Sequence, residues 1–140
     1  MEKIDKELLL EDLCARLPYH VKCKIWLEDG TTEEGLLDLE HNYGNVLQDA
    51  FYYNKIKDIK PYLRPMSSMT EDEKNYINYK WDADEYGNMM TFSSYEGGVS
   101  EIELADIVGF QDWLNKNMFD YRGLIEKNIA LDCTGLHVYD

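Results

Sequence analysis

The sequence predicts an α+β fold: an N-terminal helix, then a small, bent antiparallel β-sheet or barrel of the Sm or SH3 type, then C-terminal helices packed on it. Three patterns predict this class. Leucines recur at helical spacing over residues 5–17, apolar and polar residues alternate over residues 20–28, and Thr70 with Glu73 marks a second helix start. The likeness to Sm proteins concerns the order of elements, and folds of this kind host many functions.

The first predicted element is a helix over residues 5–17. Asp5 can accept hydrogen bonds from the free amides of its first turn, and Pro18 ends it. Four leucines form one apolar stripe that we expect to face the core: Leu9, Leu10, Leu13 and Leu17.

Four short strands are expected next. Residues 20–28 alternate in polarity as a half-buried strand does, and Asp29-Gly30 after them is a strong hairpin signal. Pro61 lacks an N–H, so it should confine the last strand to an edge or an end of the sheet. The return strand ends at 37–40, and the two further strands are expected at 46–53 and 56–63.

The join at residues 62–70 is predicted to be an ordered corner inside one folding unit, not a free spacer. Pro65 restricts the backbone, and Thr70 with Glu73 makes a capping box in which each side chain bonds the other's backbone amide. The helix that follows, about ten residues long, is too short to be stable alone in water. We therefore expect it to pack on the barrel, the nearest apolar surface.

The C-terminal part is predicted to contain a strand to about residue 105, a helix from Asp106, and a short final helix. Asp120 would cap the final helix, and Asn128 could take the left-handed conformation that ends it. Four apolar side chains are expected on one face of the helix from Asp106: Phe110, Trp113, Leu114 and Met118.

Length and composition indicate one domain, residues 1–140, with the helix and barrel in 1–65 and a mostly helical part in 66–140. With 44% hydrophobic residues and 11 tyrosines, the chain can build a packed core. No apolar run approaches the ~20 residues of a membrane span, and the acidic N-terminus does not resemble a secretion signal. The sequence thus predicts a cytoplasmic protein without membrane contact, and it leaves the oligomeric state open.

The net charge of −14 is unevenly distributed. The stretch 81–115 contains no Lys or Arg. It holds eight acids: Asp82, Asp84, Glu85, Glu96, Glu101, Glu103, Asp106 and Asp112. Such a field repels phosphate, so direct nucleic-acid binding is not expected, and it attracts a basic protein partner. Solubility alone would also account for it.

No arrangement of catalytic or cofactor-binding residues emerges. The three cysteines form no CxxC pair and suit a reducing compartment. A zinc site at Cys14, His20 and Cys23 would need His41 or His137 as a distant fourth ligand, a spacing typical of no known zinc site. The chain also lacks a Gly-x-Ser-x-Gly turn and a phosphate-binding glycine loop. We therefore expect no metal and no cofactor, and assign no catalytic residue.

The segment Asp82–Gly87 resembles the start of a calcium loop at its first, third and sixth positions. Tyr86 occupies the fifth position, and Ser93 stands at the twelfth, where a bidentate Glu is required. Calcium is therefore not expected. Three acids of the segment remain candidate contacts for a basic partner: Asp82, Asp84 and Glu85.

Arg122 is the other candidate binding residue, together with Asp120 and Tyr121, because cations are scarce in this half. It could contact a partner's carboxylate or phosphate. Alternatively, its planar guanidinium could tie helix ends together through carboxylates or carbonyls. A DNA-binding helix-turn-helix is disfavoured, because Asp120 and Glu126 accompany Arg122 and Lys127.

Three segments carry a family resemblance: LLLEDLCARLPYHVKCK (8–24), IKPYLRPMSSMTEDEK (59–74) and DWLNKNMFDYRGLIEKNIAL (112–131). They resemble an uncharacterised protein family of gut Bacteroidales and their phages and mobile elements. The resemblance implies a bacterial or phage origin and adds no chemistry. His20 stands where such proteins often have Gly, and Asn117-Met118 where they often have two histidines, so no role of that pair transfers here.

Three functions follow as hypotheses. The first is a non-catalytic module that binds another protein, suggested by the tyrosines, the acidic stretch and the absence of assembled catalytic groups. The second is an acidic mimic of nucleic acid that inhibits a DNA-binding protein. The third is a small-ligand-binding protein or enzyme, which would need a deep pocket with convergent polar groups.

Overall fold

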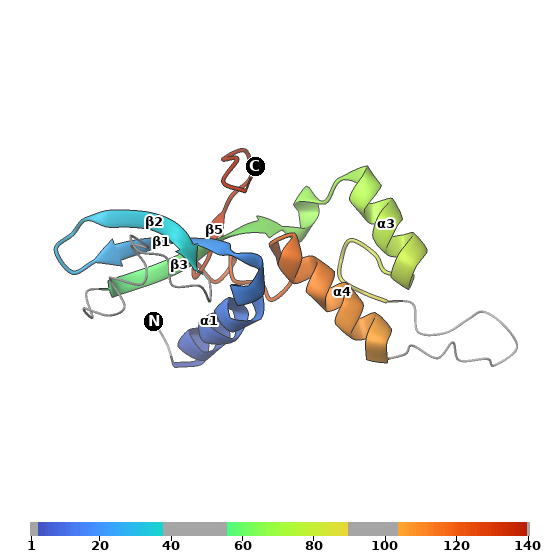
Figure 1. Cartoon of the computed structure of the whole chain (residues 1–140), viewed down its shortest axis with the longest axis horizontal. Helices are drawn as coiled ribbons and strands as arrows, with labels where there is room; N and C mark the ends of the chain where they lie inside the picture. Colours follow the sequence, from blue (N-terminus) through green and yellow to red (C-terminus); the bar gives the residue numbers. More distant parts are fainter. Residues whose placement is uncertain (1–2, 38–55, 90–103, 140) are drawn as a thin grey trace, which may run out of the picture.

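The computed structural model describes residues 3–37, 56–89 and 104–139. These residues form an α+β fold with a mixed, five-stranded open sheet. The longest strand, β3 (Ile56–Pro65), joins the two ends of the molecule (Figure 1). At one end lie α1 (Lys3–Arg16), β1 (Val21–Leu27) and β2 (Thr32–Leu37), and at the other lie α3 (Glu71–Trp81) and α4 (Leu104–Lys116).

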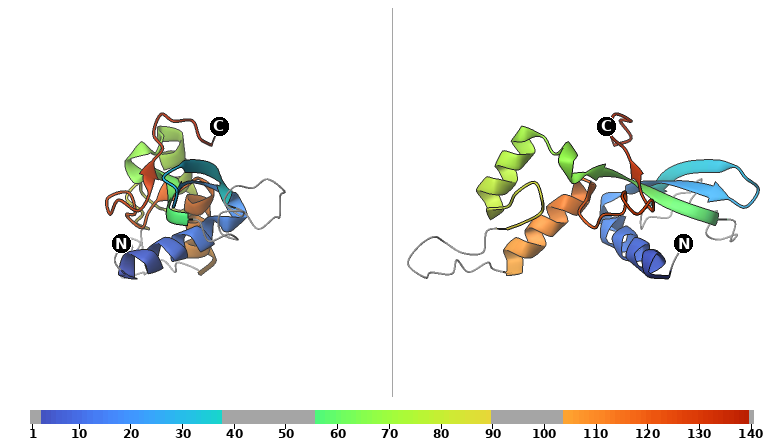
Figure 2. Two further views of the ribbon diagram at one scale, coloured as in Figure 1. Left: turned by 90° about the vertical axis from the view of Figure 1, so that its left-hand side faces the viewer. Right: turned by 180° about the vertical axis from the view of Figure 1, so that it is seen from behind.

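The predicted N-terminal helix is confirmed as α1, and a short 3-10 helix, η1 (Leu17–Tyr19), continues it. Leu9 and Leu13 are buried against the sheet, as expected. Leu10 is not: 63% of its surface is exposed. The buried face of α1 is instead completed by two charged residues, Asp12 and Arg16. Figure 2, seen end-on, shows α1 covering one face of the sheet.

The first hairpin follows the sequence pattern. Val21, Cys23 and Ile25 of β1 are buried and alternate with half-exposed residues. β1 pairs antiparallel with β2 and with β3. Gly30 has a φ of 88°, which glycine adopts without strain, and the amide of Leu27 donates to the carbonyl of Thr31 at 2.9 Å to close the turn.

The rest of the sheet differs from the prediction. The described strands do not close into a barrel, and the expected strand 46–53 lies outside the described residues. Two short strands, β4 (Phe119–Asp120) and β5 (Leu131–Asp132), pair with β3 in parallel, so the sheet is mixed and not antiparallel. Periodicity could not reveal these pairs, because two-residue strands have no measurable period.

Pro61 does not place β3 at the sheet edge, since the strand order is β2-β1-β3-β4. The proline is accommodated because β3 changes partners there. It pairs with β1 up to Pro61, then with β5 at Tyr62 and Leu63, and then with β4. Among described strands, β3 therefore has only β1 beside it at Pro61, and the missing N–H disrupts no ladder.

The join at 62–70 is an ordered corner, as predicted. It contains a 3-10 turn, η2 (Met66–Ser68), and the Ser68 hydroxyl donates to the Pro65 carbonyl at 2.7 Å. The capping box is confirmed: the Glu73 amide donates to Thr70 Oγ1 at 3.2 Å, and the Thr70 amide donates to Glu73 Oε1 at 2.9 Å. Arg64 reaches over the corner and binds Glu73 at 2.7 and 3.0 Å.

Helix α3 was predicted to pack on the small β-barrel. In the structure it packs on α4 instead. Ile77 and Trp81 of α3 belong to a second apolar cluster with Phe110 and Leu114 of α4. The sequence placed the helix correctly and its packing surface wrongly. That surface is formed by residues about thirty positions further along the chain.

Helix α4 begins at Leu104, where a strand was predicted to continue to about 105. The part of that strand at residues 100–103 lies outside the described residues. Met118 does not extend the apolar face of α4, because the helix ends at Lys116 and Met118 has a left-handed φ of 61°. It belongs instead to the first apolar cluster, which lies between α1 and the sheet and also includes Leu9, Val21 and Leu124.

The final helix predicted from Asp120 to Asn128 is absent from the described structure, where the segment after β4 forms turns. Gly123 has a φ of 76° and Asn128 a φ of 60°, so helical geometry is interrupted at both ends of a very short run. The left-handed conformation expected of Asn128 is therefore confirmed, although it closes a turn and not a helix.

The two apolar clusters meet at β4. Met118 belongs to the cluster under β1, and the next residue, Phe119, belongs to the cluster between α3 and α4. The C-terminal residues return to the first cluster. The Tyr139 hydroxyl donates to the Tyr62 carbonyl at 2.7 Å and accepts from the Lys22 amide at 2.9 Å. None of the described helices has the length and apolar character needed to cross a membrane.

Candidate functional site

Arg122 has the structural role that the sequence left open. Its Nη1 donates to Asp12 Oδ1 at 2.9 Å, and its guanidinium lies 4.5 Å from the centre of the Tyr121 ring. Only 14% of the side chain is exposed. The guanidinium therefore ties the turn after β4 to α1, and it is poorly placed to meet a partner.

The sequence did not predict the ion pair beneath Arg122. Arg16 donates from Nε and Nη2 to both carboxylate oxygens of Asp12, at 2.9 and 3.0 Å, and from Nη2 to the Phe119 carbonyl at 2.6 Å. Both side chains are fully buried. Asp12 and Arg16 share the helical face of Leu9 and Leu13. A carboxylate and a guanidinium four residues apart on an apolar stripe are the signal that could have identified them.

The cysteines beside this cluster are not poised for chemistry. Burial, with Asp12 nearby, raises the pKa of the Cys23 thiol to about 12, and burial also raises the pKa of Cys133. A protonated thiol is a poor nucleophile and a poor metal ligand. In the described part of the chain, no three His, Cys, Asp or Glu side chains lie close enough together to hold a metal ion.

Asp120 is also structural. Its carboxylate accepts from the amides of Leu124 and Ile125, both at 2.9 Å, and the residue is buried. The predicted capping role is therefore confirmed, although the capped segment is a turn. A carboxylate with both oxygens occupied by amides in the interior is not available to a partner.

The acids of the calcium-like segment follow the end of α3. Asp82 adopts a left-handed conformation, φ 51°, as the C-cap of the helix. Asp84 Oδ1 accepts from the amides of Tyr86 and Asn88, at 2.9 and 3.0 Å, which shapes the turn. Glu85 makes no such bond and is half-exposed. Of the three acids, Asp84 uses its carboxylate in the turn, whereas no described residue bonds the carboxylate of Asp82 or Glu85.

Of the eight acids in 81–115, Glu96, Glu101 and Glu103 lie outside the described residues. Asp106 and Asp112 lie on α4, in its first turn and near its middle.

A groove does join two of the predicted binding regions. It lies between the turn after Asp84 and one face of α4, has a volume of about 320 Å³, and is called here the α4 groove. Tyr121, a predicted binding residue, lies in its wall. The described lining is Tyr86, Gly87, Met89, Ile107, Phe110, Gln111, Leu114 and Tyr121.

The α4 groove is apolar with one polar wall. Gln111 Nε2 donates to the Tyr121 hydroxyl at 3.3 Å, and that hydroxyl donates to Asn115 Oδ1 at 2.9 Å. Arg16 lies on the inner side of the Tyr121 ring, 5.6 Å from its centre. Its Nη1 is the buried polar side-chain atom that has no hydrogen-bond partner among the described residues. Tyr121 thus separates the groove from the buried ion pair.

The mouth of the α4 groove is exposed, and two acids adjoin its lining residues in the sequence. Tyr86 is 78% exposed and Ile107 46% exposed. Each follows an acid in the sequence, Glu85 and Asp106, and both acids are half-exposed. The nearby Lys74 is already paired with Glu71 at 3.1 Å, and this pairing, with Glu85 and Tyr86 close by, raises the pKa of Lys74.

Ile107, Gln111 and Tyr86 were not predicted as site residues from the sequence. Four lining residues of α4 recur at helical spacing: Ile107, Phe110, Gln111 and Leu114. Only Phe110 and Leu114 of these four belonged to the apolar face predicted for the helix. The exposed Ile107 at the edge of that stripe is the signal that an apolar face continues beyond the core.

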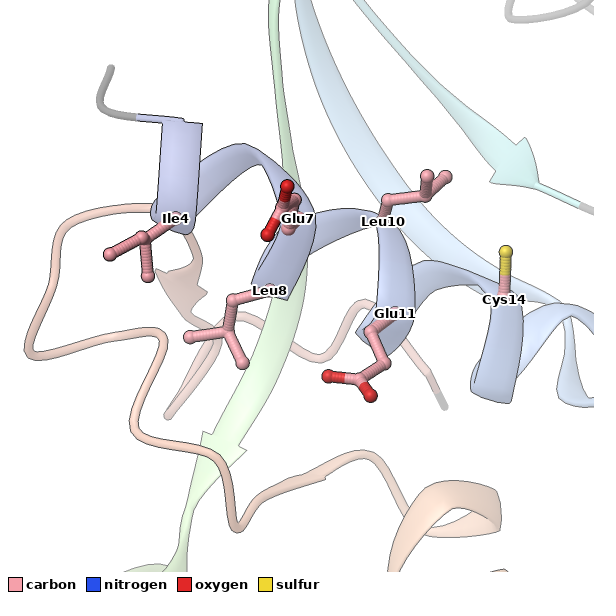
Figure 3. A pocket seen from close by; sticks show the side chains of 6 residues that line it. All are labelled: Ile4, Glu7, Leu8, Leu10, Glu11 and Cys14. Atoms are coloured by element: carbon pink, nitrogen blue, oxygen red, sulfur yellow. The ribbon is translucent and has the colours of Figure 1, made fainter.

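A second depression, of about 470 Å³, lies along the outer side of α1 (Figure 3). Figure 3 shows Leu10 and Cys14 pointing to one side of the helix and Ile4 and Leu8 to the other. The remaining lining residues are Glu7 and Glu11. Since Lys3 and Lys6 are also exposed on α1, the surface carries both signs of charge and favours no class of partner.

The chain matches no protein-family model, no curated protein and no solved structure.

Proposed function

We propose that the protein is a non-catalytic interaction module whose α4 groove binds a basic protein segment with one large apolar side chain. The main observation behind this proposal is the groove itself. It has a volume of about 320 Å³ and a largely apolar lining, and its lining includes the exposed residues Tyr86 and Ile107. An apolar anchor in such a groove would contribute most of the binding energy.

The charge around the groove supports a basic partner. Glu85 and Asp106 adjoin the exposed lining residues, and no Lys or Arg occurs in residues 81–115. Residues 71–140 together carry a net charge of −10. Such a field speeds the approach of a cationic segment and disfavours an acidic one. Tyr86 and Tyr121 in the groove lining suit the role, since tyrosine gives a large contact area at low entropic cost.

The expected setting is a bacterial, phage or mobile-element system in the cytoplasm. This part of the proposal rests on the resemblance of the three sequence segments.

The test is selection of binding peptides from a random display library against the full chain, followed by affinity measurement. The selected peptides should share Lys or Arg residues around one aromatic or aliphatic position. Replacing that position by Ala should weaken binding at least about tenfold, because the anchor leaves the groove.

Two neighbouring residues of α4 provide a matched pair of variants. Ile107→Lys places a cation in the groove and should abolish peptide binding. Val108→Lys changes a residue of nearly equal exposure, 47% against 46%, that does not line the groove, and binding should persist. If both variants bind equally well, the groove is not the site. Basic peptides without a shared apolar residue would favour the nucleic-acid mimic instead.

A further inference from the structure

The outer face of the sheet carries a basic cluster that the sequence did not predict. Val21, Cys23 and Ile25 point into the core under α1, so the alternate residues of β1 lie on the opposite face. Pairing with β3 adds a lysine to them. The cluster, called here the sheet face, consists of Lys22, Lys24, Trp26 and Lys60.

Two lysines of the sheet face are direct cross-strand neighbours. Lys24 is paired with Lys60, and the Nζ atom of each lies 5.5 Å from the centre of the Trp26 ring. Like charges directly opposite one another destabilise a sheet, and the Trp26 ring offsets only part of that repulsion. Neither lysine forms an ion pair with a described residue, and the hydrogen bond recorded for Lys60 is to neutral Asn128 Oδ1 at 3.3 Å.

The carboxylates on the same face have other bonds. Glu34, the neighbour of Lys24 on β2, accepts from the Tyr62 hydroxyl. Asp58, the neighbour of Trp26, accepts from the amide of Ile59 at 2.9 Å. Neither carboxylate forms an ion pair with the paired lysines, so an external acidic surface could add counter-charge to them.

We propose that the sheet face of one copy of this chain docks on the α4 groove of a second copy. The inference rests on the proposed function, and it names the basic partner. The groove requires cations around a large apolar group, and the sheet face offers three lysines around Trp26. Glu85 and Asp106, which adjoin the groove's lining residues in the sequence, would supply carboxylates to Lys24 and Lys60, and neither lysine forms an ion pair with a described residue.

The strands that carry the sheet face, β1 and β3, lie towards one end of the molecule, and α4, which lines the groove, lies towards the other (Figure 1). A contact between the two surfaces joins different patches of the two copies, so it is heterologous and leaves one free patch at each end of a dimer. Further copies can add, and open chains form. The net charge of −14 opposes assembly, but at physiological salt repulsion is screened beyond about 8 Å. Assembly is therefore weak and dependent on concentration.

The test is sedimentation velocity of the full chain at about 10 to 500 µM, where weak protein contacts become populated. A reducing agent keeps the exposed Cys14 from forming disulfides. The wild-type average mass should rise steadily with concentration, beyond that of a dimer. Two double variants interrupt one surface each: Lys24→Glu/Lys60→Glu on the sheet face and Glu85→Lys/Ile107→Lys on the groove.

Each double variant alone should remain monomeric over the range, with the contact weakened at least tenfold. Their equimolar mixture should form dimers and nothing larger, because the intact groove of one fits the intact sheet face of the other. Lys3→Glu/Lys6→Glu, which changes the net charge by the same amount on α1, should assemble like the wild type. Circular dichroism spectra establish that every variant is folded.

A monomeric wild type that still binds selected peptides through Ile107 would overturn self-docking and leave the proposed function intact. A monomeric wild type without peptide binding would overturn both. If the mixture stays monomeric, or if the α1 control loses assembly equally, the sheet face and groove are not the contact. Binding of a twelve-nucleotide oligothymidine that requires Lys24 and Lys60, without self-assembly, would show that the sheet face takes nucleic acid instead.

Discussion

Asp12 and Arg122, 110 positions apart in the sequence, are joined by a 2.9 Å hydrogen bond from Arg122 Nη1 to Asp12 Oδ1. Asp12 also accepts twice from Arg16, which reaches on to the Phe119 carbonyl. One buried carboxylate thus connects α1, β4 and the turn after β4. This junction also holds Tyr121, whose ring forms a wall of the α4 groove.

Replacing Asp12 by Asn should lower the free energy of unfolding by about 3 kcal/mol or more, because it leaves the fully buried Arg16 without a counter-charge. Urea denaturation followed by circular dichroism measures the change. The control is Asp112→Asn, the same substitution at an exposed position of α4, which should change stability by less than about 0.5 kcal/mol. Similar losses in the two variants would show that the buried ion pair contributes no more than a surface carboxylate.

Asp120→Asn should selectively loosen the turn after β4. The carboxylate accepts from the amides of Leu124 and Ile125, and an Asn side chain offers one acceptor oxygen in place of two. We expect a loss of about 1–3 kcal/mol and faster hydrogen exchange at these two amides. Asp132→Asn, at the exposed last residue of β5 where the acid accepts from the Thr134 amide, should leave exchange at these two amides unchanged. Unchanged exchange at Leu124 and Ile125 would contradict the role assigned to Asp120.

Thr70→Ala should cost about 1 kcal/mol, the usual contribution of an N-cap hydroxyl, because the Glu73 amide loses its acceptor. Ser67→Ala removes an exposed hydroxyl three residues earlier and serves as the comparison. Partial burial acts to raise the pKa of Glu73, but bonds from Arg64 and Thr70 together hold it below its usual value. Thr70→Ala should therefore raise this pKa, which NMR titration of the Glu73 carboxyl can follow.

Stability should fall in alkaline solution through Tyr62. Burial, and then its hydrogen bond to Glu34, raise the pKa of Tyr62 to about 12, against about 10 in the unfolded chain. The unfolded state therefore loses this proton first, and stability is lost as pH rises from about 10 towards 12. The wild type should lose about 1–3 kcal/mol more than Tyr62→Phe over that range. Parallel curves for the two proteins in urea denaturation would exclude the effect.

The candidate site was only partly predictable. Tyr121 was predicted as a binding residue because it adjoins Arg122, and the acids after α3 because they lie in a stretch without Lys or Arg. The segments that contain them both border the α4 groove. Arg122 and Asp120 were also predicted as binding residues, but both form hydrogen bonds within the chain that hold the turn after β4 in place. The difference depends on which side chains find partners within the chain, and those partners, such as Asp12, are distant in sequence.

The sequence by itself determined the local elements: the alternation of β1, the Gly30 turn, and the start of α3 at its capping box. These depend on residues within a few positions of one another, whose contacts form in any tertiary context. Tertiary structure alone decided that β4 and β5 run parallel to β3, that α3 packs on α4, and that Asp12 is buried while Leu10 is exposed. A helix stripe specifies which residues share a face, but the burial of that face depends on surfaces that other parts of the chain supply.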